Sequence, residues 1–341
     1  MLKTTVAALA ILCAAGTARA ADHIDVGVVA AMGRAPEFIA QDKGYFKALG
    51  LDVNLSPIDS TARAAAANAD GSLPILGGGI SVGFFNSLAQ GFHVKLMLEG
   101  GSTPIGANLM VRPDLAPALH GLADLKGRSI DVVAPGSVNV YVAQKMIETA
   151  GLALKDVELR FVSFGDMPSA FVNKAIDTAI VVQPTVAILE SKGFAVPWID
   201  PDDIVRPTPM LISGTLVNTD WAGRNPDATR RYFIAIARGI RDYCTAYHGG
   251  PNRREIIDIL TRNTSIKDAD FLDKSVWLSR QASGEVPMAS LMDIQDLFFR
   301  DGLIKQKFAA DQLVDMSWIR QADASLGPFA PPAGSTKAGC R

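Results

Sequence analysis

The turn Pro135-Gly136-Ser137 joins an apolar strand to an amphipathic helix that begins at once. Pro135 cannot continue a strand ladder, Gly136 permits a sharp turn, and Ser137 is a favourable N-cap residue. The first amides of a helix lack partners and lie at the positive end of its dipole. This stretch therefore predicts a seat for an anion or a polar ligand group, with Val138 and Asn139 in the first helical turn.

Other candidate ligand contacts follow the carboxyl ends of strands in two predicted α/β units. Arg34 comes directly after the first strand, where a guanidinium can grip a carboxylate or sulfonate with two hydrogen bonds. A solvated Arg at this position is an equally good interpretation. The full predicted set is Met32, Gly33, Arg34, Gly79, Ile80, Ser81, Pro135, Gly136, Ser137, Val138, Asn139, Asp166 and Gln183.

A nucleophile motif competes with this interpretation. Gly79-Ile80-Ser81-Val82-Gly83 has the G-x-S-x-G pattern of hydrolases, which need a later acid and a histidine to activate the serine. The later histidines are His93, His120 and His248, and none has the sequence context of a catalytic base. We therefore expect a binding protein rather than an enzyme, with no metal and no cofactor. A secreted serine hydrolase using Ser81 is the alternative.

The N-terminus has the three-part order of an export signal. Lys3 provides the positive charge, an apolar run follows, and Ala18-Arg19-Ala20 forms the cleavage site, so residues 1–20 are expected to be removed. The remaining 31 basic and 35 acidic residues leave a net charge of −4, which argues against nucleic-acid binding. Two cysteines remain, and the sequence leaves open whether Cys244 pairs with Cys340.

The order of predicted elements indicates two α/β lobes. Strands alternate with helices over 22–102 and again over 108–206, and a strand near 210–217 returns to the first unit before a helical region up to 325. Lobe one is thus expected to be discontinuous (22–102 plus 210–325), with the helical region packed on it, and lobe two to comprise 108–206. Two chain crossings would form a hinge, and 326–341 is expected to be a flexible tail.

Four stretches resemble the periplasmic solute-binding proteins of ABC importers of the nitrate, sulfonate and taurine type, including relatives that bind pyrimidine precursors of thiamine. They are Ala35–Val53, which contains Gly44-Tyr45-Phe46-Lys47 and Gly50-Leu51-Asp52-Val53; Leu125–Arg128 with the turn at 135–137; Ala150–Val157; and Phe171–Pro184. The chain departs from the usual family pattern at Gln183, where many relatives carry an acidic residue, and at Lys174-Ala175, where a glycine is usual.

The resemblance implies a type II periplasmic-binding-protein-like fold, in which two lobes close on one solute and present it to a membrane permease. It implies the periplasm as the location, permease and ATPase subunits as partners, and a monomer. Arg34 and the helix start at Ser137 favour a small organic anion, such as a sulfonate, taurine, nitrate or carboxylate. A neutral pyrimidine-type thiamine precursor is the alternative ligand.

Overall fold

The protein is described by a computed structural model that covers residues 21–264, 266–335, 337, 339 and 340. The predicted leader, 1–20, lies outside these residues. The first sheet has the strand order β2-β1-β3-β10-β4, with β10 antiparallel to both of its neighbours. Its strands are β1 (Asp22–Val28), β2 (Leu51–Pro57), β3 (Ile75–Gly79), β4 (Val94–Ser102) and β10 (Leu211–Asn218).

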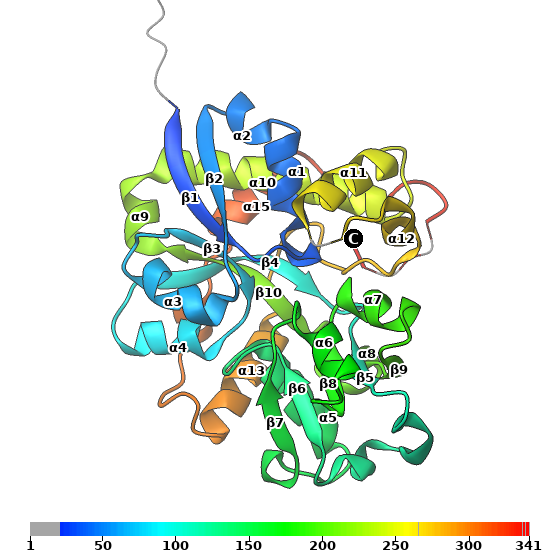
Figure 1. Ribbon diagram of the computed structural model, residues 1–341. Helices are drawn as coiled ribbons and strands as arrows, with labels where there is room; N and C mark the ends of the chain where they lie inside the picture. The colour runs from blue at the N-terminus through cyan, green and yellow to red at the C-terminus, as the bar shows by residue number, and fades with distance from the viewer. Residues whose placement is uncertain (1–20, 265, 336, 338, 341) are drawn as a thin grey trace, which may run out of the picture.

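The second sheet repeats this plan with the order β7-β6-β8-β5-β9, in which β5 is antiparallel to both neighbours. Its strands are β5 (Asn108–Val111), β6 (Ser129–Val132), β7 (Glu158–Phe161), β8 (Thr178–Val181) and β9 (Val196–Ile199). In each sheet the antiparallel strand is the first strand after a chain crossing. Figure 1 shows the two sheets as an upper and a lower lobe, so the expected two-lobed α/β class is confirmed.

The helices of lobe one come from both ends of the chain. They are α1 (Ala35–Asp42), α2 (Tyr45–Ala48), α3 (Thr61–Ala69), α4 (Val82–Ala89), α9 (Thr219–Arg224), α10 (Pro226–Tyr247), α11 (Arg253–Asn263), α12 (Ala269–Lys274), α14 (Ala310–Leu313) and α15 (Ser317–Ser325). The long helix α10 packs on α1, α11 and α15. Gly239 permits the close approach of α10 to α1, because a Cβ there would collide with the backbone of Pro36.

Lobe two carries α5 (Val138–Glu148), α6 (Met167–Val172), α7 (Thr185–Ser191) and α8 (Pro201–Ile204). Short 3-10 segments lie at Met32–Arg34, Ala116–Ala118, Leu122–Leu125 and Leu154–Asp156. Strands β6 and β8 are buried over their whole length, as expected of central strands covered on both faces. Among the described helices, none combines the length and the apolar character needed to span a membrane.

One helix of the C-terminal region, α13 (Met288–Arg300), contacts both lobes. On lobe one its Phe298 ring packs on Phe85 of α4, and its Ser290 hydroxyl accepts a hydrogen bond from the Leu211 N–H of β10 at 2.8 Å. It also contacts α5 of lobe two, beside the lower sheet in Figure 1. The Tyr141 hydroxyl donates to Asp293 Oδ2 at 2.7 Å, and Lys145 Nζ lies 2.9 Å from the same oxygen. Polar partners on a distant helix make this contact with lobe two, and helical periodicity gives no information about them.

The segment 326–341, which the sequence predicts to be a flexible tail, is attached to lobe one in the part that the structure describes. Cys340 is buried and forms a disulfide with Cys244 of α10. His248 Nδ1 lies 2.5 Å from Ser335 Oγ, and His248 Nε2 lies 3.0 Å from the Cys340 carbonyl oxygen. A covalent bond to the core of lobe one therefore holds a segment whose Pro- and Gly-rich composition predicts flexibility.

The lobes also touch each other directly. Ser81 at the start of α4 and Ser137 at the start of α5 form an isolated β-bridge, and the Val82 N–H donates to the Gly136 carbonyl at 2.8 Å. The chain passes between the sheets at 103–107 and again at 205–210. A third segment joins them there, because the Ser279 N–H donates to the Pro104 carbonyl at 2.9 Å.

Candidate ligand site

A cavity of about 120 Å³, here called the inner cavity, lies between the lobes where strand ends from both sheets meet. Predicted site residues from both lobes line it: Met32, Gly33, Arg34, Gly79, Ile80, Ser137, Val138, Asn139 and Gln183. Parallel strands place the loops at their carboxyl ends along one edge, so residues far apart in sequence reach one space. Their roles in binding remain predictions.

The other predicted residues lie elsewhere. Pro135 and Asp166 line an adjoining outer cavity of about 830 Å³, which shares walls with the inner cavity at Phe164 and Gln183. Ser81 and Gly136 line neither of these two cavities, because they form the direct contact between the lobes.

Two helix N-termini, one from each lobe, reach the inner cavity. Ser60, Thr61 and Ala62 of α3 lie in its wall opposite the start of α5 in the other lobe. Ser60 caps α3 through a bond from the Arg63 N–H, whereas the Ser137 hydroxyl donates to the Ala134 carbonyl at 2.8 Å. The prediction that the Ser137 side chain caps its helix is therefore wrong.

This local arrangement leaves donors free at the cavity. Within the described part of the chain, the amides of Val138 and Asn139 have no hydrogen-bond partner, and neither do those of Thr61 and Ala62. Backbone N–H groups at a helix start, aided by the helix dipole, bind carboxylate, sulfonate or carbonyl oxygens. Both lobes therefore offer donors to the same small volume.

Arg34 lines the inner cavity but is not the free guanidinium that the sequence suggested. It is 1% exposed, and its Nη1 donates to Glu37 Oε1 at 2.9 Å and to Thr215 Oγ1 at 2.8 Å. Its head fits beside Gly77 and Gly100, where a Cβ would collide with it. Among the described residues, its Nε and Nη2 find no hydrogen-bond partner, so two donors remain for a ligand.

Several lining residues were not predicted from the sequence, among them Ser60, Thr61 and Ala62 at the start of α3 and three residues from segments far along the chain. Ile212 and Ser213 lie on the returning strand β10, and Leu278 belongs to the segment between α12 and α13. The Ser213 hydroxyl is buried and has no partner within the described ranges. The Gln183 Oε1 oxygen is also buried and unpaired there, so the cavity offers a free acceptor as well as donors.

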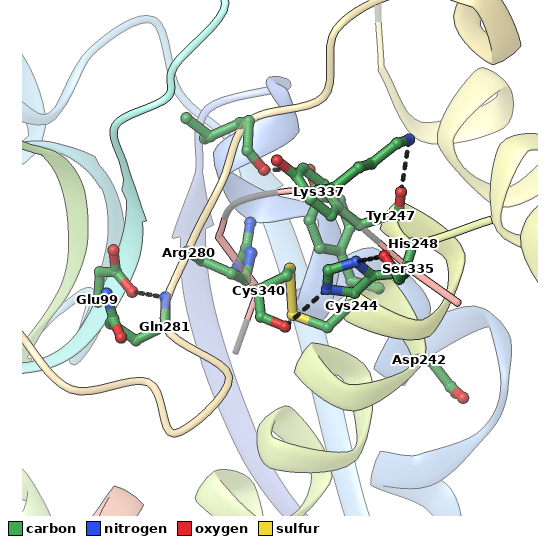
Figure 2. Close-up of a disulfide and its surroundings, with 12 residues drawn as sticks. Glu99, Asp242, Cys244, Tyr247, His248, Arg280, Gln281, Ser335, Lys337 and Cys340 are labelled. Atoms are coloured by element: carbon green, nitrogen blue, oxygen red, sulfur yellow. Dashed lines mark hydrogen bonds between the residues drawn. A yellow bond between two sulfur atoms is a disulfide. The ribbon is translucent and has the colours of Figure 1, made fainter. Parts of the chain in front are cut away.

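Two buried charged residues, Arg280 and Glu99, are labelled in Figure 2, and Arg280 contacts residues that line the cavity. Arg280 is 1% exposed, its guanidinium lies 4.4 Å from the centre of the Tyr243 ring, and burial lowers its pKa. Burial raises the pKa of the nearby Glu99 carboxyl, which accepts a hydrogen bond from the Gln281 N–H. Arg280 Nη2 reaches the carbonyls of Met32 and Gly33 at 3.3 and 3.5 Å.

The geometry does not assemble the hydrolase alternative. Ser81 is 1% exposed, and its hydroxyl has no hydrogen-bond partner in the described portion of the chain. His93 Nδ1 instead lies 2.8 Å from Asp220 Oδ1, and both ring nitrogens of His248 bond residues of the C-terminal segment. A serine nucleophile needs a base within hydrogen-bond reach.

A sequence profile of the NMT1/THI5-like family matches residues 32–247, which include all the predicted site residues. The chain belongs to this family. A Brucella abortus protein named as a binding protein is 24% identical over 236 residues, which make up 68% of this chain and 68% of that protein.

Solved structures with the same fold include binding proteins and an enzyme. The periplasmic nitrate-binding protein NrtA of Synechocystis PCC 6803 has a TM-score of 0.73 at 14% identity, covering 94% of this chain and 92% of that one. The periplasmic aliphatic sulphonate-binding protein SsuA of Escherichia coli has a TM-score of 0.67 at 17% identity, and the match covers 87% of this chain and 99% of that one. The desulfurization enzyme DszB has a TM-score of 0.58 at 15% identity, and the match covers 89% of this chain and 99% of that one. At these identities the likeness establishes the fold.

Proposed function

We propose that this chain is the solute-binding component of an ABC import system and that it captures a small organic anion in the inner cavity. The observation that carries this proposal is the convergence of unpaired donors from both lobes on one enclosed space. They are the amides at the starts of α3 and α5, Arg34 Nε and Nη2, and the Ser213 hydroxyl. The folds of nitrate- and sulphonate-binding proteins support it.

The rest of the cavity wall favours an anion with a hydrocarbon body. Its apolar side chains include Met32, Ile80, Ile105, Val138 and Leu278. Of the described lining residues, Arg34 and Asp59 are the charged ones, and the Asp59 side chain is 84% exposed. An ammonium group would find no buried carboxylate partner here, and nitrate would face hydrocarbon on several sides.

In the proposed cycle the exported chain, cleaved after Ala20, acts in the periplasm as a monomer. Ligand contacts on both lobes stabilise the closed arrangement, because a ligand shifts a conformational equilibrium only by its differential affinity for the two states. The closed protein then presents its solute to a membrane permease that an ATPase subunit drives.

The test is a thermal-shift screen of the mature chain with nitrate, taurine, propane-1-sulfonate, benzenesulfonate, benzoate and an aminopyrimidine. A true ligand at a hundredfold excess over its dissociation constant stabilises by about 2.7 kcal/mol. Taurine and propane-1-sulfonate form a matched pair of nearly equal shape, differing by an ammonium in place of a methyl. We expect the sulfonate to bind more tightly; a screen in which no member shifts the melting temperature contradicts the binding function.

A neutral pyrimidine is the second candidate ligand. It is favoured by Glu37, which balances the charge of Arg34, and by the free Gln183 Oε1, which can accept an N–H of an aminopyrimidine. Stabilisation by the aminopyrimidine with no shift from any anion would select this ligand class.

A further inference from the structure

Arg280 lies directly behind the wall of the inner cavity, in the irregular segment between α12 and α13. Its guanidinium donates to the carbonyls of Met32 and Gly33 at 3.3 and 3.5 Å. Both of these residues line the cavity, and the next residue is Arg34, which also lines it and whose Nε and Nη2 have no partner among the described residues. The side chain of Arg280 therefore contacts the backbone of the loop Met32–Arg34 directly.

The backbone around Arg280 is fixed on both sides. On one side the Gln281 N–H donates to the Glu99 carboxylate of β4. The Ser279 N–H donates to the Pro104 carbonyl at 2.9 Å, and the Ser279 carbonyl accepts from the Ser102 N–H at 3.1 Å. These bonds attach residues 279–281 to the end of β4 and to the first crossing between the lobes.

On the other side, the C-terminal segment holds Arg280. The Cys340 N–H donates to the Arg280 carbonyl at 2.9 Å, and Cys340 is itself bonded to Cys244 in the buried face of α10. Gly339 has a φ of +86°, and a Cβ there would press on the Ser279 side chain. Figure 2 shows Arg280 between the Glu99–Gln281 pair and Cys340.

Burying a guanidinium costs the free energy of removing a charged group from water. Arg280 is fully buried, and burial without full compensation is commonly less stable than an apolar side chain of similar volume. Its guanidinium donates hydrogen bonds to two carbonyls of the loop Met32–Arg34 rather than to a carboxylate. This choice of partners points to loop placement rather than to packing.

We propose that Arg280 is a positioning residue for the binding loop Met32–Arg34, and that the C-terminal segment, fastened by the Cys244–Cys340 disulfide, holds Arg280 in register. The consequence for affinity rests on the proposed function, whereas the consequence for the loop does not. The disulfide thus acts on the ligand site through Arg280.

The test measures hydrogen exchange of residues 31–35 by mass spectrometry in the ligand-free mature chain. Arg280→Met keeps an apolar side chain in place but removes both hydrogen bonds, and we expect exchange of this segment to accelerate about tenfold or more, since hydrogen bonds from charged donors are of that strength. Arg280→Lys should restore part of the protection. Residues 129–132 of β6, in the other lobe, should exchange as in the wild type.

Two further variants address the C-terminal segment. Cys340→Ser and Gly339→Ala should both accelerate hydrogen exchange of residues 31–35. Gly339→Ala retains both cysteines. The double variant with Cys340→Ser and Arg280→Met should exchange residues 31–35 little faster than Arg280→Met alone, because both changes act through the Arg280 side chain. Ile257→Ala, in the core of α11, lowers global stability and should leave exchange of 31–35 unchanged.

Unchanged exchange at 31–35 in Arg280→Met, or additive effects in the double variant, would overturn the positioning role. Titration with propane-1-sulfonate then reports affinity, which we expect to fall about fivefold to tenfold in Arg280→Met. If the wild type does not bind this probe, the choice of a sulfonate fails while the exchange result still decides the role of Arg280.

Discussion

Closure of the lobes can be tested at Gly136, the point where lobe two touches α4 of lobe one. Gly136 has a φ of +65°, and a Cβ there would lie 3.0 Å from Val82 Cβ and 3.3 Å from one of its methyl groups. Gly136→Ala therefore has two effects. The left-handed backbone costs about 1 kcal/mol in any state of the lobes, whereas the clash with Val82 arises only when they meet.

The size of the clash sets the expected loss of affinity. A separation of 3.0 Å is several tenths of an ångström closer than ordinary carbon contacts, and overpacking of this kind costs about 1–3 kcal/mol. The variant also strains the 2.8 Å hydrogen bond from the Val82 N–H to the Gly136 carbonyl. We expect the dissociation constant to rise at least fivefold.

Gly151→Ala is the matched control. Gly151 has a φ of +73°, and no atom lies within 4 Å of the Cβ that it would gain. It should lose similar thermal stability without a change in affinity, as measured by calorimetric titration with the best ligand of the screen. If both variants bind as the wild type does, the lobes do not need the Gly136–Val82 approach to hold a ligand, and the closure argument is wrong.

Three other changes have defined outcomes. Arg34→Met should weaken binding of propane-1-sulfonate tenfold or more, because hydrogen bonds from a charged donor worth about 1.5–3 kcal/mol are lost. Binding of a neutral pyrimidine should change little. Equal losses of affinity for both ligands would show that Arg34 does not select for anions. Burial raises the pKa of Asp131 to about 6. The folded protein then binds this proton more tightly than the unfolded chain, so stability should fall by up to about 3 kcal/mol between pH 4 and pH 7. Asp131→Asn should flatten this part of the urea-unfolding profile, and an unchanged profile would exclude Asp131. Cys340→Ser should lower the free energy of unfolding by about 4 kcal/mol, given the 96-residue separation of the paired cysteines; a melting temperature like that of the wild type would show that the disulfide does not form.

The sequence predicted the architecture because the relevant signals are local. The alternation of strand and helix patterns over 22–102 and 108–206 identifies most elements of the two sheets within a few residues. Where the prediction failed locally, one residue accounts for it. The residue pattern over 36–49 predicts a single helix, but Gly44, which has a φ of +70°, divides this stretch into α1 and α2.

The cavity residues that could be predicted share one property: they follow the ends of strands whose order is readable from the chain. Met32, Gly79 and Gln183 reach the cavity for this reason. Ser213 and Leu278 could not be found in this way, because their places depend on how β10 returns between β3 and β4 and on how the segment before α13 crosses the end of β4.

Arg34 shows why a residue's position is not enough to assign its role. Its place after β1 was predictable, but its surroundings were not, because they are built from Glu37 on the next helical turn, Thr215 far along the chain, and the space left by Gly77 and Gly100. An Arg that is already ion-paired contributes less net charge than a free one but has a fixed orientation. In the proposed site, selectivity would come from the fixed positions of its unpaired Nε and Nη2 donors together with the helix amides. For that reason, anything that shifts the loop 32–34, including a change at the far C-terminus, should alter which ligands bind.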